Sequence, residues 1–489
     1  MMAKTKYFGT DGVRGRVGQE SLEPDFVLRL GFAAGKILTS ASKAHPTFVV
    51  GRDTRQSGQM LQSALTAGML ASGATVIDLG VIPTPGVAFM TRKLNADAGV
   101  VISASHNPVD ENGIKFFNPA GMKLREEVEQ EIEAVIDGDM NLAGMHAADF
   151  GRSIDGTDMR ELYLDDLVAE HNGLRLDDLT LVLDCANGAA SWYAPEAFAR
   201  LGAKVVTIQS SPTGTNINNM AGSEHVRSHP TDLAALIRQY DANFGIVFDG
   251  DADRVIFVDD QGDLVDGDHM LAILANYLRK HDRLLADTVV STHMANGALV
   301  DYFGQRNIKF IETPVGDKYV MEKLVQLQAQ IAEPGKLGLG GEQSGHIILM
   351  DDVHRTGDGI RSALYVIQAY LESGERSLSA MAVSINKYPQ LVASCYVASK
   401  PNLEEIEPLS ELLAEIKQDL PGLVRMNTRY SGTEPKFRLM LEADTRHSMR
   451  ELADKAWAVC ELLQRVTQTP IGASVEVLNV TSGGLLGKA

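Results

Sequence analysis

FGIVFDGDADR, at residues 244–254, decides the fold, because a short apolar run leads directly into a loop of aspartates and glycine. A short apolar run bounded by turn residues is typical of a buried strand. The same arrangement recurs in TFVVGRDTR (47–55), AGVVISASHNP (98–108), DTVVSTHMANG (287–297) and KLGLGGEQSGH (336–346). Ligands of α/β sheets bind beyond the carboxyl ends of the strands, so these loops are the first candidates for function.

Helical patterns such as FVLRLGFAAGKIL (26–38) separate the strand candidates. Apolar strands that alternate with helices predict an α/β fold with mixed, largely parallel sheets. The last part of the chain differs, since a strand, a helix, an alternating strand and a final amphipathic helix are typical of α+β structure. We therefore expect three related α/β domains and a smaller C-terminal α+β domain. The predicted domains are residues 1–155, 156–260, 261–380 and 381–489.

The charge of the chain excludes several partners. Its 489 residues carry 45 lysines and arginines against 64 aspartates and glutamates, a formal net charge of −19. A protein this acidic repels the phosphates of nucleic acids and of anionic membranes. No apolar run approaches the roughly 18 residues that a membrane span needs. We expect neither nucleic acid nor membrane as a partner, and any bound anion must be held by local clusters of arginine and lysine.

The N-terminal sequence and the cysteines indicate a cytoplasmic protein. MMAKTKYFGTDG (1–12) contains no apolar segment of the kind found in secretory signals. Cys185, Cys395 and Cys460 are odd in number, far apart and without C-x-x-C spacing. We therefore expect neither a disulfide framework nor a zinc site, and the three thiols fit a reducing compartment.

SASHNP, at 103–108, crowds hydroxyl, imidazole and amide groups into the turn that follows a strand candidate. Ser105 is a candidate acceptor of a phosphoryl group, and His106 and Lys115 lie close to it in the sequence as candidate catalytic groups. The alternative is a plain turn in which serine and asparagine side chains only bond the backbone.

DGDADR, at 249–254, brings Asp249, Asp251 and Asp253 into one short loop. Carboxylates this close repel one another unless a cation neutralises them, and hard oxygen ligands suit magnesium. An EF-hand also begins D-x-D-x-D, but its sixth position must be glycine and is Arg254 here. The loop therefore predicts a magnesium site, with a solvated acidic turn as the alternative.

Two later loops predict contacts to a phosphorylated sugar. GGEQSGH (340–346) offers an acceptor, a hydroxyl and a titratable ring, which are Glu342, Ser344 and His346. RYSGTEPKFR (429–438) combines a guanidinium, two hydroxyls and a glycine backbone in the manner of a phosphate cradle. The cradle residues are Arg429, Ser431, Gly432 and Thr433. The segment is not a Walker sequence, and a plain turn with a surface arginine is the alternative.

Together the four loops resemble the α-D-phosphohexomutase superfamily, whose family loops occur here in the same order over nearly the whole chain. The resemblance implies three α/β domains and a fourth domain similar to the TATA-binding protein, arranged around a central cleft. It also implies that Ser105 is a phosphoserine that shares a magnesium ion with the three aspartates. Further matches to the active site of the superfamily are Arg14, Lys115, Arg254 and His346, with Glu342 and Ser344 on the sugar and Arg429, Ser431 and Thr433 on the phosphate that is not transferred.

KYFGTDGVRG (6–15), GTNIN (214–218), GSEH (222–225) and TGDG (356–359) are most similar to the phosphoglucosamine mutase branch of this superfamily. That branch implies an isomerase that interconverts D-glucosamine 6-phosphate and α-D-glucosamine 1-phosphate through a bisphosphorylated sugar, for amino-sugar nucleotide and cell-wall precursor synthesis. It implies one magnesium ion per subunit and hexose mono- and bisphosphates as ligands, and it is compatible with a homodimer. The alternatives are a phosphoglucomutase or phosphomannomutase, a sugar phosphatase, and a non-catalytic sugar-phosphate-binding protein.

Overall fold

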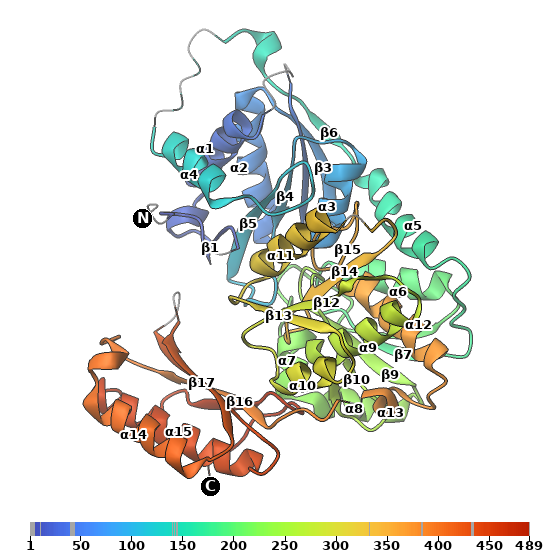
Figure 1. Cartoon of the computed structure of the whole chain (residues 1–489). Helices are drawn as coiled ribbons and strands as arrows, with labels where there is room; N and C mark the ends of the chain where they lie inside the picture. Colours follow the sequence, from blue (N-terminus) through green and yellow to red (C-terminus); the bar gives the residue numbers. More distant parts are fainter. Residues whose placement is uncertain are drawn as a thin grey trace.

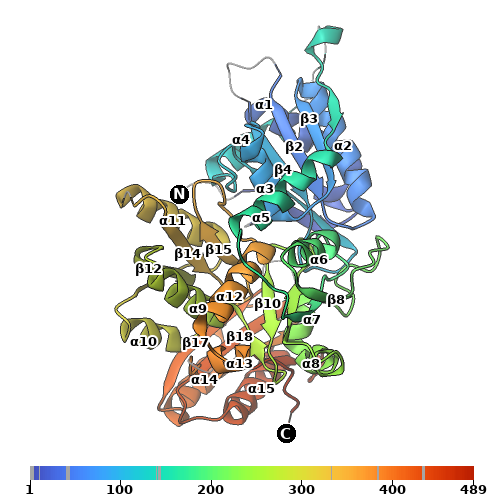
Figure 2. The same cartoon turned by 90° about the vertical axis from the view of Figure 1, so that its right-hand side faces the viewer.

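The computed structural model describes residues 5–9, 11–39, 45–138, 140, 142, 145–331, 333–382, 385–431 and 435–488. In these residues four sheets follow one another along the chain, and each defines one of the domains that we number I to IV. Figures 1 and 2 show domain I at the top, domains II and III beneath it, and domain IV at the bottom. In Figure 1 domain IV stands apart as a separate lobe. The predicted fold class, three α/β domains followed by an α+β domain, is confirmed.

Domain I is built on a sheet in the order β1-β5-β4-β2-β3-β6, in which β5 alone runs antiparallel to its neighbours. Its strands are β1 (Val13–Arg16), β2 (Thr47–Arg52), β3 (Thr75–Val81), β4 (Ala98–Ile102), β5 (Glu111–Phe117) and β6 (Ser153–Asp155). Its helices are α1 (Pro24–Ile37), α2 (Ser57–Ser72), α3 (Thr84–Lys93) and α4 (Glu126–Ile136), with short 3-10 turns at Glu20–Leu22 and Ala147–Asp149. Alternate residues of β2 pack on opposite faces, Val50 with α1 and α2 and Val49 with α3.

Domains II and III also combine parallel strands with one strand of opposite direction, in the orders β11-β10-β9-β7-β8 and β13-β12-β14-β15. The opposite strand is β10 in domain II and the edge strand β15 in domain III. Domain II contains a 3-10 turn (Thr157–Arg160), α5 (Glu161–Glu170), β7 (Thr180–Asp184), α6 (Ala190–Arg200), β8 (Lys204–Ile208), α7 (Gly222–Ser228), α8 (Pro230–Gln239), β9 (Phe244–Phe248), β10 (Val255–Val258) and β11 (Leu264–Val265). Domain III contains α9 (Gly267–Lys280), β12 (Leu284–Thr292), α10 (Ala298–Gly304), β13 (Lys309–Thr313), α11 (Asp317–Gln330), β14 (Leu337–Gly341), β15 (Ile347–Met350), α12 (Gly359–Ser373) and α13 (Leu378–Ala382).

Domain IV has a fully antiparallel sheet in the order β17-β18-β16-β19. Its elements are β16 (Gln390–Tyr396), a 3-10 turn (Leu403–Glu405), α14 (Glu407–Asp419), β17 (Leu423–Tyr430), β18 (Lys436–Ala443), α15 (Met449–Val466) and β19 (Glu476–Asn479). Helix α15 packs on β16 and β18, and α14 packs beside it, so both helices cover one face of the sheet.

The four loops singled out in the sequence occupy equivalent places in the four sheets. Each joins a strand to an antiparallel partner: β4 to β5, β9 to β10, β14 to β15, and β17 to β18. In the first three domains the leading strand is also one of the parallel set. The loops therefore leave their sheets at the carboxyl end of the leading strand, where a ligand can be reached from all four domains.

Domains I, II and III are fused by a shared apolar core, whereas domain IV has a core of its own. Phe89 of α3, Phe244 of β9 and Leu339 of β14 belong to one continuous buried cluster. Phe437 and Val459 belong to a cluster made of domain IV residues alone. The lobe of domain IV can therefore be treated as a separately packed unit.

None of the described helices has the length and apolar character that a membrane crossing requires.

A buried chain of amides and carboxyls joins domain IV to domain III. Gln343, in the loop after β14, donates hydrogen bonds to Asp268 and to the Gln390 side-chain oxygen, both at 2.7 Å. Gln390 donates in turn to Glu442 of β18 at 2.7 Å, and Glu442 also accepts the Gly297 N–H at 3.0 Å. The orientation of the lobe is thus coupled to the loop that carries Glu342 and Ser344.

Glu442 gives this joint a pH dependence. Burial raises the pKa of Glu442 to about 7, although the Gly297 N–H and Arg425 oppose the shift and Asp268 adds to it. Lys387, which pairs with Asp266 and Asp268, is the remaining nearby cation and also opposes the shift. Because the pKa is higher in the folded chain than the ordinary 4.5, the folded state binds this proton more tightly. The resulting stability is complete below about pH 4.5 and is lost as the pH rises through 7.

We expect Glu442→Gln to flatten the pH dependence of domain IV unfolding. Between pH 5 and 8 the unmodified chain should lose on the order of 3 kcal/mol more unfolding free energy than the variant, an upper limit from 1.36 kcal/mol per pKa unit. The chain has two tryptophans. In a Trp192→Phe background, Trp457 of α15 reports urea unfolding of domain IV alone. If the unfolding free energy of domain IV changed with pH equally in the two chains, Glu442 would not be the group responsible for the pH dependence.

Candidate active site

Ser105 lies in the loop after β4 with its backbone in the left-handed region, at φ +53°. This conformation is costly for a residue with a Cβ and persists only where the surroundings impose it. The Ser105 N–H donates to Ser103 Oγ at 2.9 Å, and Ser103 donates to Asp53 at 2.7 Å. Arg55 and Asn218 donate to the Ser105 carbonyl oxygen at 3.0 and 2.8 Å. These contacts fix the direction of the serine side chain.

The Ser105 hydroxyl meets the loop between β9 and β10, where three aspartates gather. Its Oγ donates a hydrogen bond to Asp249. Asp249, Asp251 and Asp253 are all buried, and each contributes a carboxylate oxygen to a group whose members lie within 4.8 Å of one another. The predicted phosphoryl acceptor and the predicted metal ligands, which come from different domains, therefore share one site.

Burying three carboxylates together changes their protonation. Burial raises the pKa of Asp249 well above its usual range, and the charges of Asp253 and Asp251 add to the shift. Burial alone would also raise the pKa of Asp253, but His346 and Lys115 outweigh it and hold that pKa well below its usual range. The loop thus favours an added positive charge, either a proton or a metal cation.

The aspartate loop fits a magnesium ion. Oδ1 of Asp251 and Oδ1 of Asp253 are buried without a hydrogen-bond partner, so two acceptors are available in the interior. Thr84, the first residue of α3, donates to the other Asp251 oxygen at 2.6 Å and fixes that carboxylate. Carboxylate oxygens with such supporting contacts are the donors that magnesium prefers.

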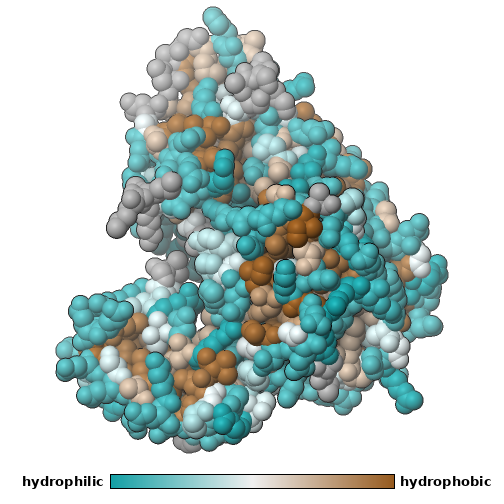
Figure 3. All heavy atoms as spheres, in the orientation of Figure 1, coloured by the Kyte–Doolittle hydropathy of each residue, from teal (hydrophilic) through white to brown (hydrophobic). Residues whose placement is uncertain are grey.

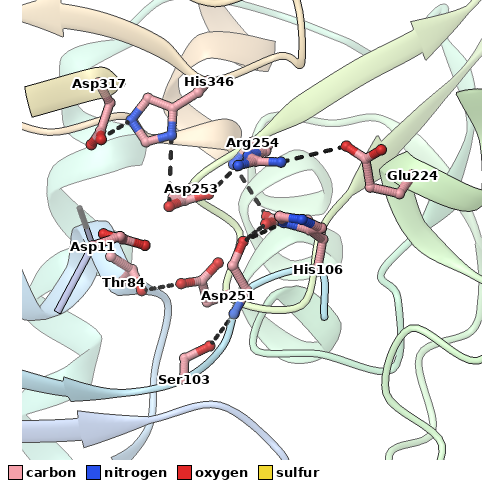
Figure 4. Close-up of polar contacts among 12 residues, drawn as sticks. Asp11, Thr84, Ser103, His106, Glu224, Asp251, Asp253, Arg254, Asp317 and His346 are labelled. Carbon is pink, nitrogen blue, oxygen red and sulfur yellow. Dashed lines mark hydrogen bonds and ion pairs between the residues drawn. The ribbon is translucent and has the colours of Figure 1, made fainter. Parts of the chain in front are cut away.

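Lys115, Arg254 and His346 lie around the aspartates, and Figure 4 shows Arg254 and His346 beside Asp253. Lys115 of β5 lies 2.9 Å from Asp251 and 3.7 Å from Asp253. Arg254 lies 3.8 Å from Asp253, and His346 Nδ1 lies 3.6 Å from the same carboxylate. Burial would lower the pKa of Lys115 and of His346, but the neighbouring carboxylates outweigh it and raise both. The neighbouring carboxylates therefore favour the charged form of both side chains.

His106 is the neutral group beside the serine. Its Nδ1 lies 3.4 Å from Ser105 Oγ. Burial and the positive charge of Arg254 lower the pKa of His106 to about 4, so the ring is uncharged near pH 7. Arg254 in turn lies 3.4 Å from Glu224 of α7, whose pKa is lowered to about 2 because Arg227, His106 and Arg254 outweigh burial.

A cleft of about 580 Å³ opens beside this cluster and is lined by all four domains. His106 comes from domain I, Arg254 from domain II, Glu342 and Ser344 from domain III, and Arg429 from domain IV. Figure 3 shows the molecule hollowed between the lobe of domain IV and the rest. The whole chain is strongly acidic, but Arg227 and Arg438 line the cleft in addition to Arg254 and Arg429. A phosphorylated ligand of about the size of a hexose fits such a lining.

Four further predicted residues remain to be placed besides Arg429, which lines the cleft: Arg14, Ser431, Gly432 and Thr433. Arg14 of β1 pairs with Asp11, which lies 3.3 Å from Lys115. Arg429 stands opposite Arg438 in the β17–β18 register, and burial together with that neighbour lowers the Arg429 pKa. Ser431 is buried and does not line the cleft in the part of the chain described here. Gly432 and Thr433 lie outside the described residues.

Sequence reasoning missed several residues that complete the site. Asp11 and Glu224 lie inside stretches that carried the family resemblance, KYFGTDGVRG and GSEH, so a signal for them was present. Thr84 gave no signal, because its role depends on a contact with Asp251 across 167 positions of sequence. Lys123 and Asp317 pair with each other and contact side chains that in turn contact the aspartates. Neither was singled out from the sequence.

Family models match the chain in all four domains. The phosphoglucomutase/phosphomannomutase α/β/α domain I matches residues 5–142, domain II matches 161–262, domain III matches 266–388, and the C-terminal domain matches 395–458. A phosphoglucosamine mutase of Geobacillus kaustophilus is 43% identical over 92% of this chain and 97% of its own length. One of Halalkalibacterium halodurans is 44% identical over 90% of this chain and 95% of its own length.

Solved structures with the same fold carry related names. A putative phosphomannomutase of Thermus thermophilus superposes with a TM-score of 0.71 at 23% identity, covering 94% of this chain and 99% of that one. The N-acetylphosphoglucosamine mutase of Aspergillus fumigatus, in complex with GlcNAc-6P and magnesium, superposes with a TM-score of 0.63 at 18% identity, covering 95% and 96%. At these identities the likeness is one of fold.

Proposed function

We propose that this chain, which belongs to the phosphoglucomutase/phosphomannomutase family and within it to the phosphoglucosamine mutases, interconverts D-glucosamine 6-phosphate and α-D-glucosamine 1-phosphate. The observation that carries the proposal is the Ser105 hydroxyl, hydrogen-bonded to Asp249 of a buried aspartate trio at the edge of a four-domain cleft. The product would feed amino-sugar nucleotide and cell-wall precursor synthesis.

In the proposed cycle phosphorylated Ser105 donates to the free hydroxyl of a hexose monophosphate. The Ser105 Oγ–P bond breaks as the bond from phosphorus to the sugar oxygen forms, and the hydroxyl proton passes to a base. His106 supports this role because it is neutral and lies 3.4 Å from Ser105 Oγ. The bisphosphorylated sugar then turns end for end, and its other phosphoryl group returns to Ser105 by the reverse step.

Charged groups around Ser105 would stabilise the transferring phosphoryl group. Lys115 and Arg254 are held positive by the aspartates, and Lys115 is able to donate a proton to a leaving oxygen. Asp249, Asp251 and Asp253 would hold magnesium, which when bound supplies positive charge against the phosphoryl oxygens. The phosphate that stays on the sugar would lie at Arg429, with Ser431, Gly432 and Thr433 completing the cradle and Glu342 and Ser344 contacting sugar hydroxyls. Arg14 and His346 would support the charge balance.

A cytoplasmic location belongs to the same proposal, and the family resemblance is compatible with a homodimer. The three cysteines are free and buried, which fits a reducing compartment. The domain limits near residues 155, 260 and 380 are also proposed. Those near 155 and 380 lie between successive sheets, whereas that near 260 lies between β10 and β11, the last two strands of the domain II sheet along the chain.

We expect Ser105→Ala to abolish isomer formation while leaving the fold intact, because the alanine has no oxygen to carry a phosphoryl group. Ser63→Ala, on the exposed face of α2, is the matched control and should leave turnover unchanged. Isomer formation is followed by chromatography of the sugar phosphates, covalent phosphate by intact-mass analysis, and folding by thermal denaturation. Persisting isomerisation in the Ser105 variant would refute the role of this serine.

Sugar specificity is tested with the 1-phosphates of glucosamine, glucose and mannose under identical conditions. We expect the largest kcat/KM for the glucosamine compound. A larger value for glucose or mannose would instead assign the chain to phosphoglucomutase or phosphomannomutase activity. Steady release of inorganic phosphate without an isomer would indicate a sugar phosphatase, and a lack of turnover with intact binding would indicate a sugar-phosphate-binding protein.

A further inference from the structure

Six side chains form a closed ring of alternating charge beside the aspartate trio. In ring order they are Asp11, Lys123, Asp317, His346, Asp253 and Lys115. Domain I supplies three of them, domain III two, and domain II one, so the ring closes only where these domains meet. In Figure 4 dashed lines connect Asp317 to His346 and His346 to Asp253, and Asp11 lies nearby.

Every neighbour in the ring is within ion-pair distance. Lys123 Nζ lies 2.5 Å from Asp11 and 2.7 Å from Asp317. Asp317 Oδ2 lies 3.4 Å from His346 Nε2, and His346 Nδ1 lies 3.6 Å from Asp253. Lys115 lies 3.7 Å from Asp253 and 3.3 Å from Asp11, and these two contacts close the ring.

The imidazole of His346, one member of this ring, has little freedom to rotate. His346 is buried, and a carboxylate faces each of its two nitrogens. Gly357 packs against the ring so closely that a Cβ there would lie 2.3 Å from Nε2. Loss of the Asp317 carboxylate would therefore release one of the two contacts that set the orientation of His346 beside Asp253.

We propose that Lys123 and Asp317 are positioning residues for the metal site, acting through His346 on the Asp253 carboxylate. Neither pairs directly with the aspartate trio, yet their ion pair ties domain I to domain III at the start of α11, beside His346 in the loop between β14 and β15. Partners of metal-binding side chains set the orientation of the ligand, and their loss typically costs about 10- to 100-fold in metal affinity or activity. The inference rests on the proposed function, since it assigns a support to the magnesium site proposed there.

The test is magnesium binding to the full-length, dephosphorylated chain by isothermal titration calorimetry, together with turnover. Asp317→Asn and Lys123→Met should each weaken magnesium binding about 10- to 100-fold and lower kcat, with KM for the sugar phosphate within about twofold. Lys123→Arg keeps the charge and should restore most of the affinity. The double variant should lose little more than either single variant, because both changes break one contact.

Glu170→Gln is the matched control. The Glu170–Arg361 pair joins α5 to α12 at 2.6 Å, and Glu170 is exposed to nearly the same extent as Asp317, at 19% against 17%. This variant should lower the thermal midpoint without changing magnesium affinity.

Magnesium affinity equal to that of the unmodified chain in both Asp317→Asn and Lys123→Met would overturn the inference, whatever their thermal stability. If Asp317→Asn does not fold, the two Lys123 variants decide the matter in the same way. If the unmodified chain binds no magnesium, or binds it equally well after Asp251→Asn, the proposed metal site fails and the inference fails with it.

Discussion

The burial of three carboxylates against one serine hydroxyl is the constraint on which the rest of this molecule depends. Like charges this close are unstable in a protein interior unless cations face them. Here the cations are drawn from separate parts of the chain, Lys115 from β5 and His346 from the loop after β14. The aspartates can therefore be buried only where domains I, II and III meet, and the apolar core that these domains share keeps the meeting point fixed.

The chemistry that was predictable from sequence lies in contiguous stretches. Ser105 and the three aspartates each follow an apolar strand directly, so residue type and place along the chain were sufficient to select them. The supporting residues could not be predicted in this way, because they lie far along the chain from the groups that they contact. Asp317 pairs with Lys123, 194 positions away, and Asn218 reaches Ser105 across 113 positions. Such pairings are set by how domains pack, which local periodicity does not encode.

The same limit applies to the joint between domains III and IV. The fold class and the order of the four domains followed from strand and helix patterns, but nothing in those patterns indicated that Gln343 bonds to Gln390 and through it to Glu442. The joint begins in the loop that carries the proposed sugar contacts and ends in the sheet that carries Arg429. The loop with Glu342 and Ser344 and the sheet with Arg429 are therefore connected through buried hydrogen bonds.

The separate core of domain IV has an evolutionary consequence. The lobe packs on an apolar core of its own, and Ser105 and the three aspartates all lie outside it. Recombination between related genes at the short connection before β16 would exchange the lobe that carries Arg429 and leave the codons for Ser105 and the aspartate trio unchanged.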